Sequence, residues 1–252
     1  MSPWGHLLAS SLGKKYLMGL SGLVLAGFVL GHMAGNLQIF LPPEYINAYG
    51  HKLQTLPYKL LWVVRAFLLF CVVVHLWMAV VLTVENRRAR PEGYEVEATV
   101  EASLASRTMI WSGGILLLFI GFHLLHFTVR SIFDYSNLPF ILDGEVVHDV
   151  YAMMYLGFTH WYVSLFYVVA MGLLCMHLSH GVSSMFQTFG FRNEKWSGRL
   201  NCLATTYGWV VFAGFISIPV AVLLTHYGGV ELLDKAHVYA TVALGKGLMG
   251  VQ

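Results

Sequence analysis

The sequence predicts an all-α integral membrane protein, a bundle of five transmembrane helices within a single membrane domain of residues 1–252. The first supporting observation is composition. Of the 252 residues, 57% are hydrophobic and 11% are charged, whereas a soluble domain carries about 25% charged residues. The second is the presence of five apolar segments, each long enough to cross about 30 Å of hydrocarbon as a helix. The outward-facing surface must therefore be apolar, which indicates contact with lipid.

The hydrophobic runs place the five spans at residues 16–40, 60–84, 109–129, 161–189 and 202–225. We take the first run as a retained helix rather than a signal peptide, because no small-residue cleavage site follows it. Two connecting segments also have expected structures. Residues 41–57 include a proline pair near their start and predict a short interfacial helix on the outer side. Residues 92–106 alternate acids with apolar residues and predict a cytoplasmic extension of the third span.

The basic residues of the connecting segments predict the orientation in the membrane. If the helices alternate in direction, nine basic residues fall on one side: Lys14, Lys15, Arg87, Arg88, Arg90, Arg107, Arg192, Lys195 and Arg199. The longest loop on the opposite side is acidic, with Asp134, Asp143, Glu145 and Asp149. The positive-inside rule then places the N-terminus in the cytoplasm and the C-terminus outside.

Four histidines, one in each of the first four spans, are the most informative residues: His32, His75, His123 and His177. A histidine inside a membrane helix is costly and indicates a functional site. The helical rise places His32 and His123 at matching depths, roughly 25 and 24 Å from the cytoplasmic ends of their spans. His75 lies at roughly 15 Å and His177 at roughly 22 Å, a poorer match. The four therefore form two levels, an outer pair and an inner pair.

Two imidazoles at equal depth on different helices can be the axial ligands of a haem, so the four histidines predict two haems. No C-x-x-C-H motif is present, which excludes covalent c-type attachment. Histidines bonded to backbone carbonyls are the structural alternative. His126 and His180 each follow a proposed ligand by three residues and are secondary candidates. His180, at roughly 18 Å, matches the depth of His75 better than His177 does, so depth alone leaves this ligand open.

Five short motifs lie in order along the predicted spans. They are SSLGKK at residues 10–15, GHMAGN at 31–36, VVVHLW at 72–77, FHLLHF at 122–127 and HLSHGVSS at 177–184. With them the chain resembles the dihaem cytochrome b membrane anchor of succinate:quinone oxidoreductases, in the single-anchor type shared with some fumarate reductases. The resemblance implies His32 and His123 as ligands of an outer haem b and His75 and His177 as ligands of an inner haem b. It favours His177 over His180, because the family's ligand lies four residues before the glycine, here Gly181.

The resemblance further implies a non-catalytic electron-transfer subunit in a bacterial cytoplasmic membrane. A flavoprotein subunit and an iron–sulfur subunit would dock on its cytoplasmic side, and quinone, typically menaquinone, would be the electron partner in the bilayer. The net charge of +2 gives no reason to expect a nucleic-acid partner. The main alternative is a dihaem cytochrome b of another respiratory complex, such as a hydrogenase or formate dehydrogenase. A transporter and a purely structural bundle subunit are further alternatives.

Other polar residues are weaker candidates. Partners for haem propionates, which equally suit topology signals, are Ser10, Ser11, Lys14, Lys15, Arg192 and Lys195 on the inner side and Lys52, His126 and Arg130 on the outer side. Arg65 is expected to extend toward the outer interface. Glu44, Tyr45 and His51 are outer-side candidates for contact with quinone, with a solvated loop as the alternative. We expect His6, His148, His160, His226 and His237 to be ordinary surface groups.

Overall fold

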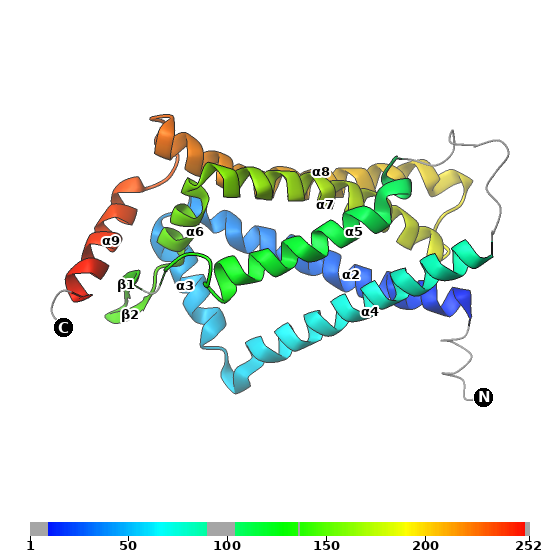
Figure 1. Ribbon diagram of the computed structural model, residues 1–252, viewed down its shortest axis with the longest axis horizontal. Helices are drawn as coiled ribbons and strands as arrows, with labels where there is room; N and C mark the ends of the chain where they lie inside the picture. Colours follow the sequence, from blue (N-terminus) through cyan, green and yellow to red (C-terminus); the bar gives the residue numbers. More distant parts are fainter. Residues whose placement is uncertain (1–9, 90–103, 136, 250–252) are drawn as a thin grey trace. The chain divides into compact units, whose positions relative to one another are not determined.

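The computed structural model describes residues 10–89, 104–135 and 137–249 (Figure 1). Its long helices are α2 (Ser11–Asn36), α4 (Leu60–Arg88), α5 (Leu104–His123), α7 (Trp161–Thr188) and α8 (Glu194–Tyr227). Shorter helices are α3 (Pro43–Gln54), α6 (Val150–Thr159) and α9 (Lys235–Met249). Single turns η1 (Leu37–Phe40), η2 (Pro57–Lys59) and η3 (Leu124–Thr128) connect some of them. Strands β1 (Pro139–Leu142) and β2 (Glu145–His148) form a hairpin.

Five helical segments of the described chain are long and apolar enough to cross a membrane. They are Ser11–Phe40, Pro57–Arg88, Met109–Thr128, Trp161–Thr188 and Glu194–Tyr227. The prediction of an all-α membrane protein with five spans is thus confirmed. The helix of the last span, α8, begins eight residues before the predicted residue 202, because polar residues such as Lys195 and Arg199 continue it outside the apolar run. The expected extension over residues 92–106 lies mostly outside the described residues, and α5 begins at Leu104.

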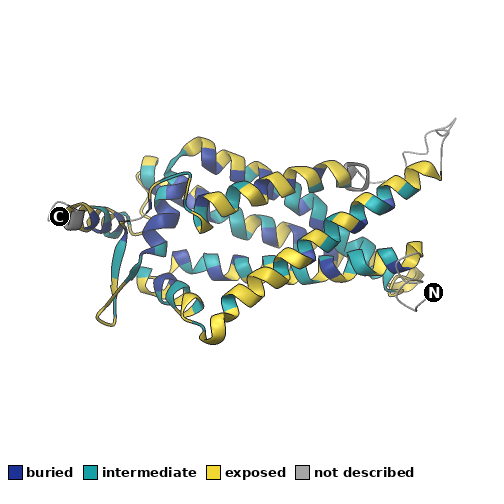
Figure 2. Cartoon of the chain, turned by 60° about the horizontal axis from the view of Figure 1, so that its bottom comes forward, coloured by how far each residue is buried: buried dark blue, intermediate teal, exposed yellow. Residues whose placement is uncertain are grey.

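Exposed residues occur along the length of the spans (Figure 2). Many of them have large apolar side chains, as helices facing lipid do. Trp77 of α4 is 64% exposed, and Trp111 and Leu118 of α5 are 73% and 74% exposed. In a water-soluble protein such side chains would form the core. Their exposure over several helices indicates a hydrocarbon surrounding, so the bilayer is a partner of this chain.

The chain divides into two compact units. Unit one comprises residues 1–30, 62–114 and 174–210, and unit two comprises residues 31–61, 115–173 and 211–252. Helices α2, α5, α7 and α8 contribute residues to both, whereas α4 belongs almost entirely to unit one. The division separates the four histidines of the spans: His75 and His177 belong to unit one, and His32 and His123 belong to unit two.

Unit two contains the elements outside the five spans. Helix α3 confirms the short helix expected within residues 41–57, and Pro43 occupies its first turn, where proline is favoured. Helices α6 and α9 and the hairpin were not predicted. Helix α6 packs against both α3 and α9, and seven of its ten residues are buried. The hairpin turns at Asp143 and Gly144, whose φ angles of 51° and 86° suit the tight turns that match strand twist.

Candidate functional site

The inner pair of histidines lies within unit one. His75 on α4 and His177 on α7 face each other, with ring centroids 6.3 Å apart and ring planes inclined by 61°. His180 lies one turn further along α7, and its Nε2 contacts Ser184 Oγ of the same helix at 3.1 Å. The structure therefore places His177 opposite His75, as the motif suggested and as depth alone did not.

Each ring of the inner pair is oriented by a hydrogen bond at Nδ1. His75 Nδ1 lies 3.1 Å from the carbonyl oxygen of Met18 on α2. His177 Nδ1 lies 3.3 Å from the hydroxyl of Ser112 on α5, and that hydroxyl itself donates to the Met109 carbonyl. Both contacts suit an Nδ1–H donor, which is the tautomer that directs Nε2 toward a metal.

Glycines border both rings of the inner pair. A Cβ atom added at Gly22 would lie 3.2 Å from His75 Cε1, and one added at Gly113 would lie 3.5 Å from His177 Cε1. At Gly22 the ring would have to move to admit a side chain. The backbones of α2 and α5 thus approach the two rings closely and limit their rotation.

The outer pair lies within unit two. His32 at the end of α2 and His123 at the end of α5 have ring centroids 5.7 Å apart and ring planes inclined by 81°. His123 Nδ1 lies 3.2 Å from the Tyr167 hydroxyl on α7. His32 differs from the other three, because its Nε2 accepts from the Asn36 amide at 3.1 Å. A metal bound through His32 Nε2 would take the place of this hydrogen bond.

The two pairs fit the geometry of a haem with two imidazole ligands. An imidazole nitrogen binds a transition metal at about 2 Å, so two imidazoles on opposite sides of one iron have ring centroids about 6 Å apart. The measured separations, 6.3 and 5.7 Å, lie on either side of that value. In each pair the rings come from two separate spans, which is the arrangement that an iron bound between helices needs.

His126 is a fully buried residue of η3, the π-helical turn that ends the third span. Its Nδ1 lies 3.0 Å from the Tyr167 hydroxyl, and its Nε2 lies 3.0 Å from the Tyr135 hydroxyl. The ring of Phe127 stacks on it at 3.9 Å between centroids. His126 therefore has two phenol partners, which the sequence did not predict.

Some of the basic residues expected near propionates are engaged elsewhere. Lys14 forms an ion pair with Glu85, and Arg192 Nε donates to Ser197 Oγ at 3.0 Å. The Arg65 guanidinium lies 4.9 Å from the ring centroid of Trp62. Among the remaining inner-side candidates, Ser10 accepts from the Gly13 amide, Ser11 and Lys15 lie near the start of α2, and Lys195 lies in the first turn of α8. On the outer side, Lys52 lies in the last turn of α3, and Arg130 follows η3 with a φ of 60°.

The outer-side candidates for quinone contact lie along α3. Glu44 and Tyr45 are exposed in its first turns, and His51 near its end lies 3.7 Å from Glu145 of the hairpin. Their positions suit a solvated helix, the alternative that the sequence left open.

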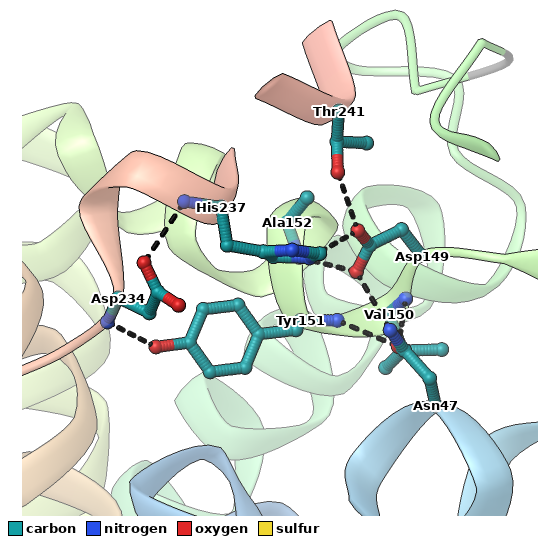
Figure 3. Close-up of polar contacts among 8 residues, drawn as sticks. All are labelled: Asn47, Asp149, Val150, Tyr151, Ala152, Asp234, His237 and Thr241. Atoms are coloured by element: carbon teal, nitrogen blue, oxygen red, sulfur yellow. Dashed lines mark hydrogen bonds and ion pairs between the residues drawn. The ribbon is translucent and has the colours of Figure 1, made fainter. Parts of the chain in front are cut away.

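A second cluster of polar residues, which the sequence did not predict, surrounds Asp149 in unit two (Figure 3). Asp149 has no exposed surface, and its carboxylate accepts from Asn47 Nδ2 at 3.0 Å and from the Ala152 amide at 2.9 Å. It also accepts from His237 Nε2 at 2.7 Å and from Thr241 Oγ1 at 2.9 Å. The cluster joins α3, α6 and α9. Asp149 lies in a loop, as expected, but it is fully buried. His237 was expected to be an ordinary surface group, and this was wrong, because its half-buried ring pairs with Asp149.

The Asp149 cluster shifts the pKa values of both of its titratable members. Burial alone would raise the pKa of Asp149, but hydrogen bonds from His237, Ala152 and Asn47 lower it below its ordinary value. The hydrogen bond to Asp149 raises the pKa of His237, and this exceeds the lowering that burial causes. The pair is therefore a charged one over a wide range of pH. Nearby on β2, burial lowers the pKa of His148 to about 4.

Comparisons with family models, with curated proteins and with solved structures gave no match to this chain. Sequence reasoning found the four paired histidines. It missed their hydrogen-bond partners Asn36, Ser112 and Tyr167. Only Asn36 had a sequence signal, since it lies four residues after His32 on the same helix face.

Proposed function

We propose that this chain is a dihaem cytochrome b membrane anchor that passes electrons between a cytoplasmic iron–sulfur subunit and quinone, in a succinate:quinone oxidoreductase. The observation that supports it most strongly is the pairing of four histidines from four spans into two sets, at 6.3 and 5.7 Å between ring centroids. Haem, when bound, supplies a one-electron carrier held within the bilayer. His75 with His177 would hold the inner haem, and His32 with His123 the outer one.

The residues around each pair orient the ligands. The Met18 carbonyl and the Ser112 hydroxyl hold the Nδ1–H groups of His75 and His177, and Tyr167 holds that of His123. Such partners fix the ring orientation and increase the basicity of the ligand. Within a bilayer, the apolar side chains of the spans would keep water from both levels, which would favour electron transfer over side reactions. The chain would thus act as a conductor, while the substrate chemistry takes place in its partner subunits.

Features of the sequence support the proposed orientation in the membrane and the proposed partner subunits. The basic residues of the connecting segments favour a cytoplasmic N-terminus, which directs the inner pair toward a cytoplasmic iron–sulfur subunit. The five motifs favour succinate:quinone oxidoreductase, with menaquinone as the typical quinone, in a bacterial cytoplasmic membrane. A hydrogenase or formate dehydrogenase partner would use the same two haems.

An absorption spectrum of the purified chain, with haem quantified by the pyridine haemochrome method, tests the proposal. We expect about two b-type haems per chain and a reduced α-band. A colourless protein purified from haem-replete cells would refute the proposal. Succinate–quinone reductase activity of the co-purified complex then separates the succinate-linked assignment from a hydrogenase-type partner.

A further inference from the structure

A continuous chain of hydrogen bonds links His123 to the loop that follows the third span. His123 Nδ1 lies 3.2 Å from the Tyr167 hydroxyl, which lies 3.0 Å from His126 Nδ1. His126 Nε2 in turn lies 3.0 Å from the Tyr135 hydroxyl. Tyr167, His126 and Tyr135 are all buried, and all four residues belong to unit two. The polar groups of these three buried residues therefore have protein partners, as buried groups require.

If His123 binds iron through Nε2 and the buried Tyr167 O–H donates within this hydrogen-bond network, the donors can be ordered in only one way. Its Nδ1 must then carry the proton and donate to the Tyr167 oxygen. The Tyr167 O–H is left to donate to His126 Nδ1, so neutral His126 carries its proton on Nε2 and donates to Tyr135. The tautomer of His126 and the rotation of the Tyr167 hydroxyl are thus linked to the ligand.

Close packing prevents His126 from leaving this position. The ring of Phe127 stacks on it at 3.9 Å between centroids. A Cβ atom added at Gly157 of α6 would lie 2.8 Å from Phe127 Cε1 and 3.0 Å from His126 Nε2. The turn that carries His126 is π-helical, a local departure from the α-helix that is frequent at functional sites.

We propose that Tyr167 and His126 are positioning residues that tune the outer haem. His126 Nδ1 accepts a hydrogen bond from the Tyr167 O–H. The Tyr167 oxygen therefore remains an acceptor toward His123 Nδ1. An acceptor at Nδ1 makes an imidazole a stronger electron donor to iron. A stronger donor stabilises the ferric state, so the arrangement holds the midpoint potential of the outer haem low. This inference rests on the proposed function, because it presupposes a haem on His32 and His123.

Potentiometric titration of the purified complex carrying Tyr167→Phe tests the inference. We expect the outer haem to become easier to reduce, by about tenfold in the ferrous-to-ferric ratio at fixed potential, or about 59 mV. The inner haem should keep its potential. Tyr155→Phe is the matched control, since Tyr155 is also buried in unit two and its hydroxyl has no hydrogen-bond partner among the described residues. It should leave both potentials unchanged.

Variants of His126 separate tuning from simple packing. Glutamine can accept from Tyr167 and donate to Tyr135, so His126→Gln should keep the outer potential near that of the wild type. His126→Leu removes both bonds and should raise it. Equal potentials in His126→Gln and His126→Leu, or no difference between Tyr167→Phe and the wild type, would overturn the inference while the proposed function stands. Absence of haem from the wild-type chain would instead refute the proposed function itself.

Discussion

His75 and His177 face each other from α4 and α7, and each ring is oriented by a hydrogen bond from a further span. The Met18 carbonyl of α2 and the Ser112 hydroxyl of α5 hold the two Nδ1 atoms. The rings are 6.3 Å apart between centroids, close to the separation that one iron between two imidazoles requires. Four of the five spans thus contribute to one ligand pair, so the pair depends on the fold rather than on any single motif.

Alanine variants of the two ligands of one haem should lose that same haem. His75→Ala and His177→Ala should both remove the inner haem, whereas His32→Ala and His123→Ala should both remove the outer one. Each variant loses one of two axial ligands, and a haem held by a single imidazole is less strongly retained. Redox-difference spectra and haem content per chain measure the outcome. His180→Ala is the control and should retain both haems; loss of haem there, with retention in His177→Ala, would exchange the two assignments.

The sequence was sufficient to predict the five spans and the pairing of His32 with His123. Long apolar runs can satisfy their backbone polar groups in lipid only as helices, so the five hydrophobic runs were enough to predict the five spans. Helical rise then placed His32 level with His123, and the structure brings these two together. Helical rise could not decide between His177 and His180 as the partner of His75, because the answer depends on where α7 ends and how the helix is rotated.

The Asp149 cluster was not predictable from local patterns. Asp149 stands in an acidic loop segment, and its partners Asn47, His237 and Thr241 are distant along the chain. Burial of a carboxylate is a tertiary property that no window of sequence displays. One local signal was present, since Asp149 precedes the apolar segment of α6 and caps it through the Ala152 amide. Helix α6 itself was missed because ten residues are too few to register as a span.

Close approach of α7 and α8 within unit one gives a stability prediction. A Cβ atom added at Gly208 of α8 would lie 2.8 Å from the Cys175 carbonyl oxygen and would collide with the Ser179 side chain. Gly208→Ala should therefore lower the thermal midpoint of the purified protein, at a cost of about 1–3 kcal/mol. Gly198→Ala on the same helix has nothing within 4 Å and should be neutral or slightly stabilising. Equal midpoints for the two variants would contradict this packing.

Membrane orientation can be tested with single cysteines. Asp143→Cys lies in the exposed turn of the hairpin, and Lys195→Cys lies at the exposed start of α8. In a background with Cys71, Cys175 and Cys202 replaced by serine or alanine, a membrane-impermeant maleimide should label Asp143→Cys in intact cells. Lys195→Cys should be labelled only after permeabilisation. The reverse pattern would show that the positive-inside argument fails for this chain.

The pairing of Asp149 with His237 predicts a pH window of greatest stability. The raised pKa of His237 contributes stability that is fully present below its ordinary value of 6.5 and is lost as the pH rises through the folded-state value. The lowered pKa of Asp149 contributes stability that is present above its ordinary value of 3.8 and is lost as the pH falls through the folded-state value. The contribution of the pair should therefore be greatest between these two ordinary values.

Replacement of either member should change the pH profile of the thermal midpoint in a distinct way. Asp149→Asn removes a buried charge that accepts four hydrogen bonds, and we expect a loss of about 2–4 kcal/mol near neutral pH. His237→Gln keeps a donor to Asp149 but cannot titrate, so the decline on the alkaline side should disappear while the acid side remains. Asp143→Asn, in the exposed turn of the hairpin, is the control and should leave the profile unchanged. An unaltered alkaline decline in His237→Gln would show that another group produces it.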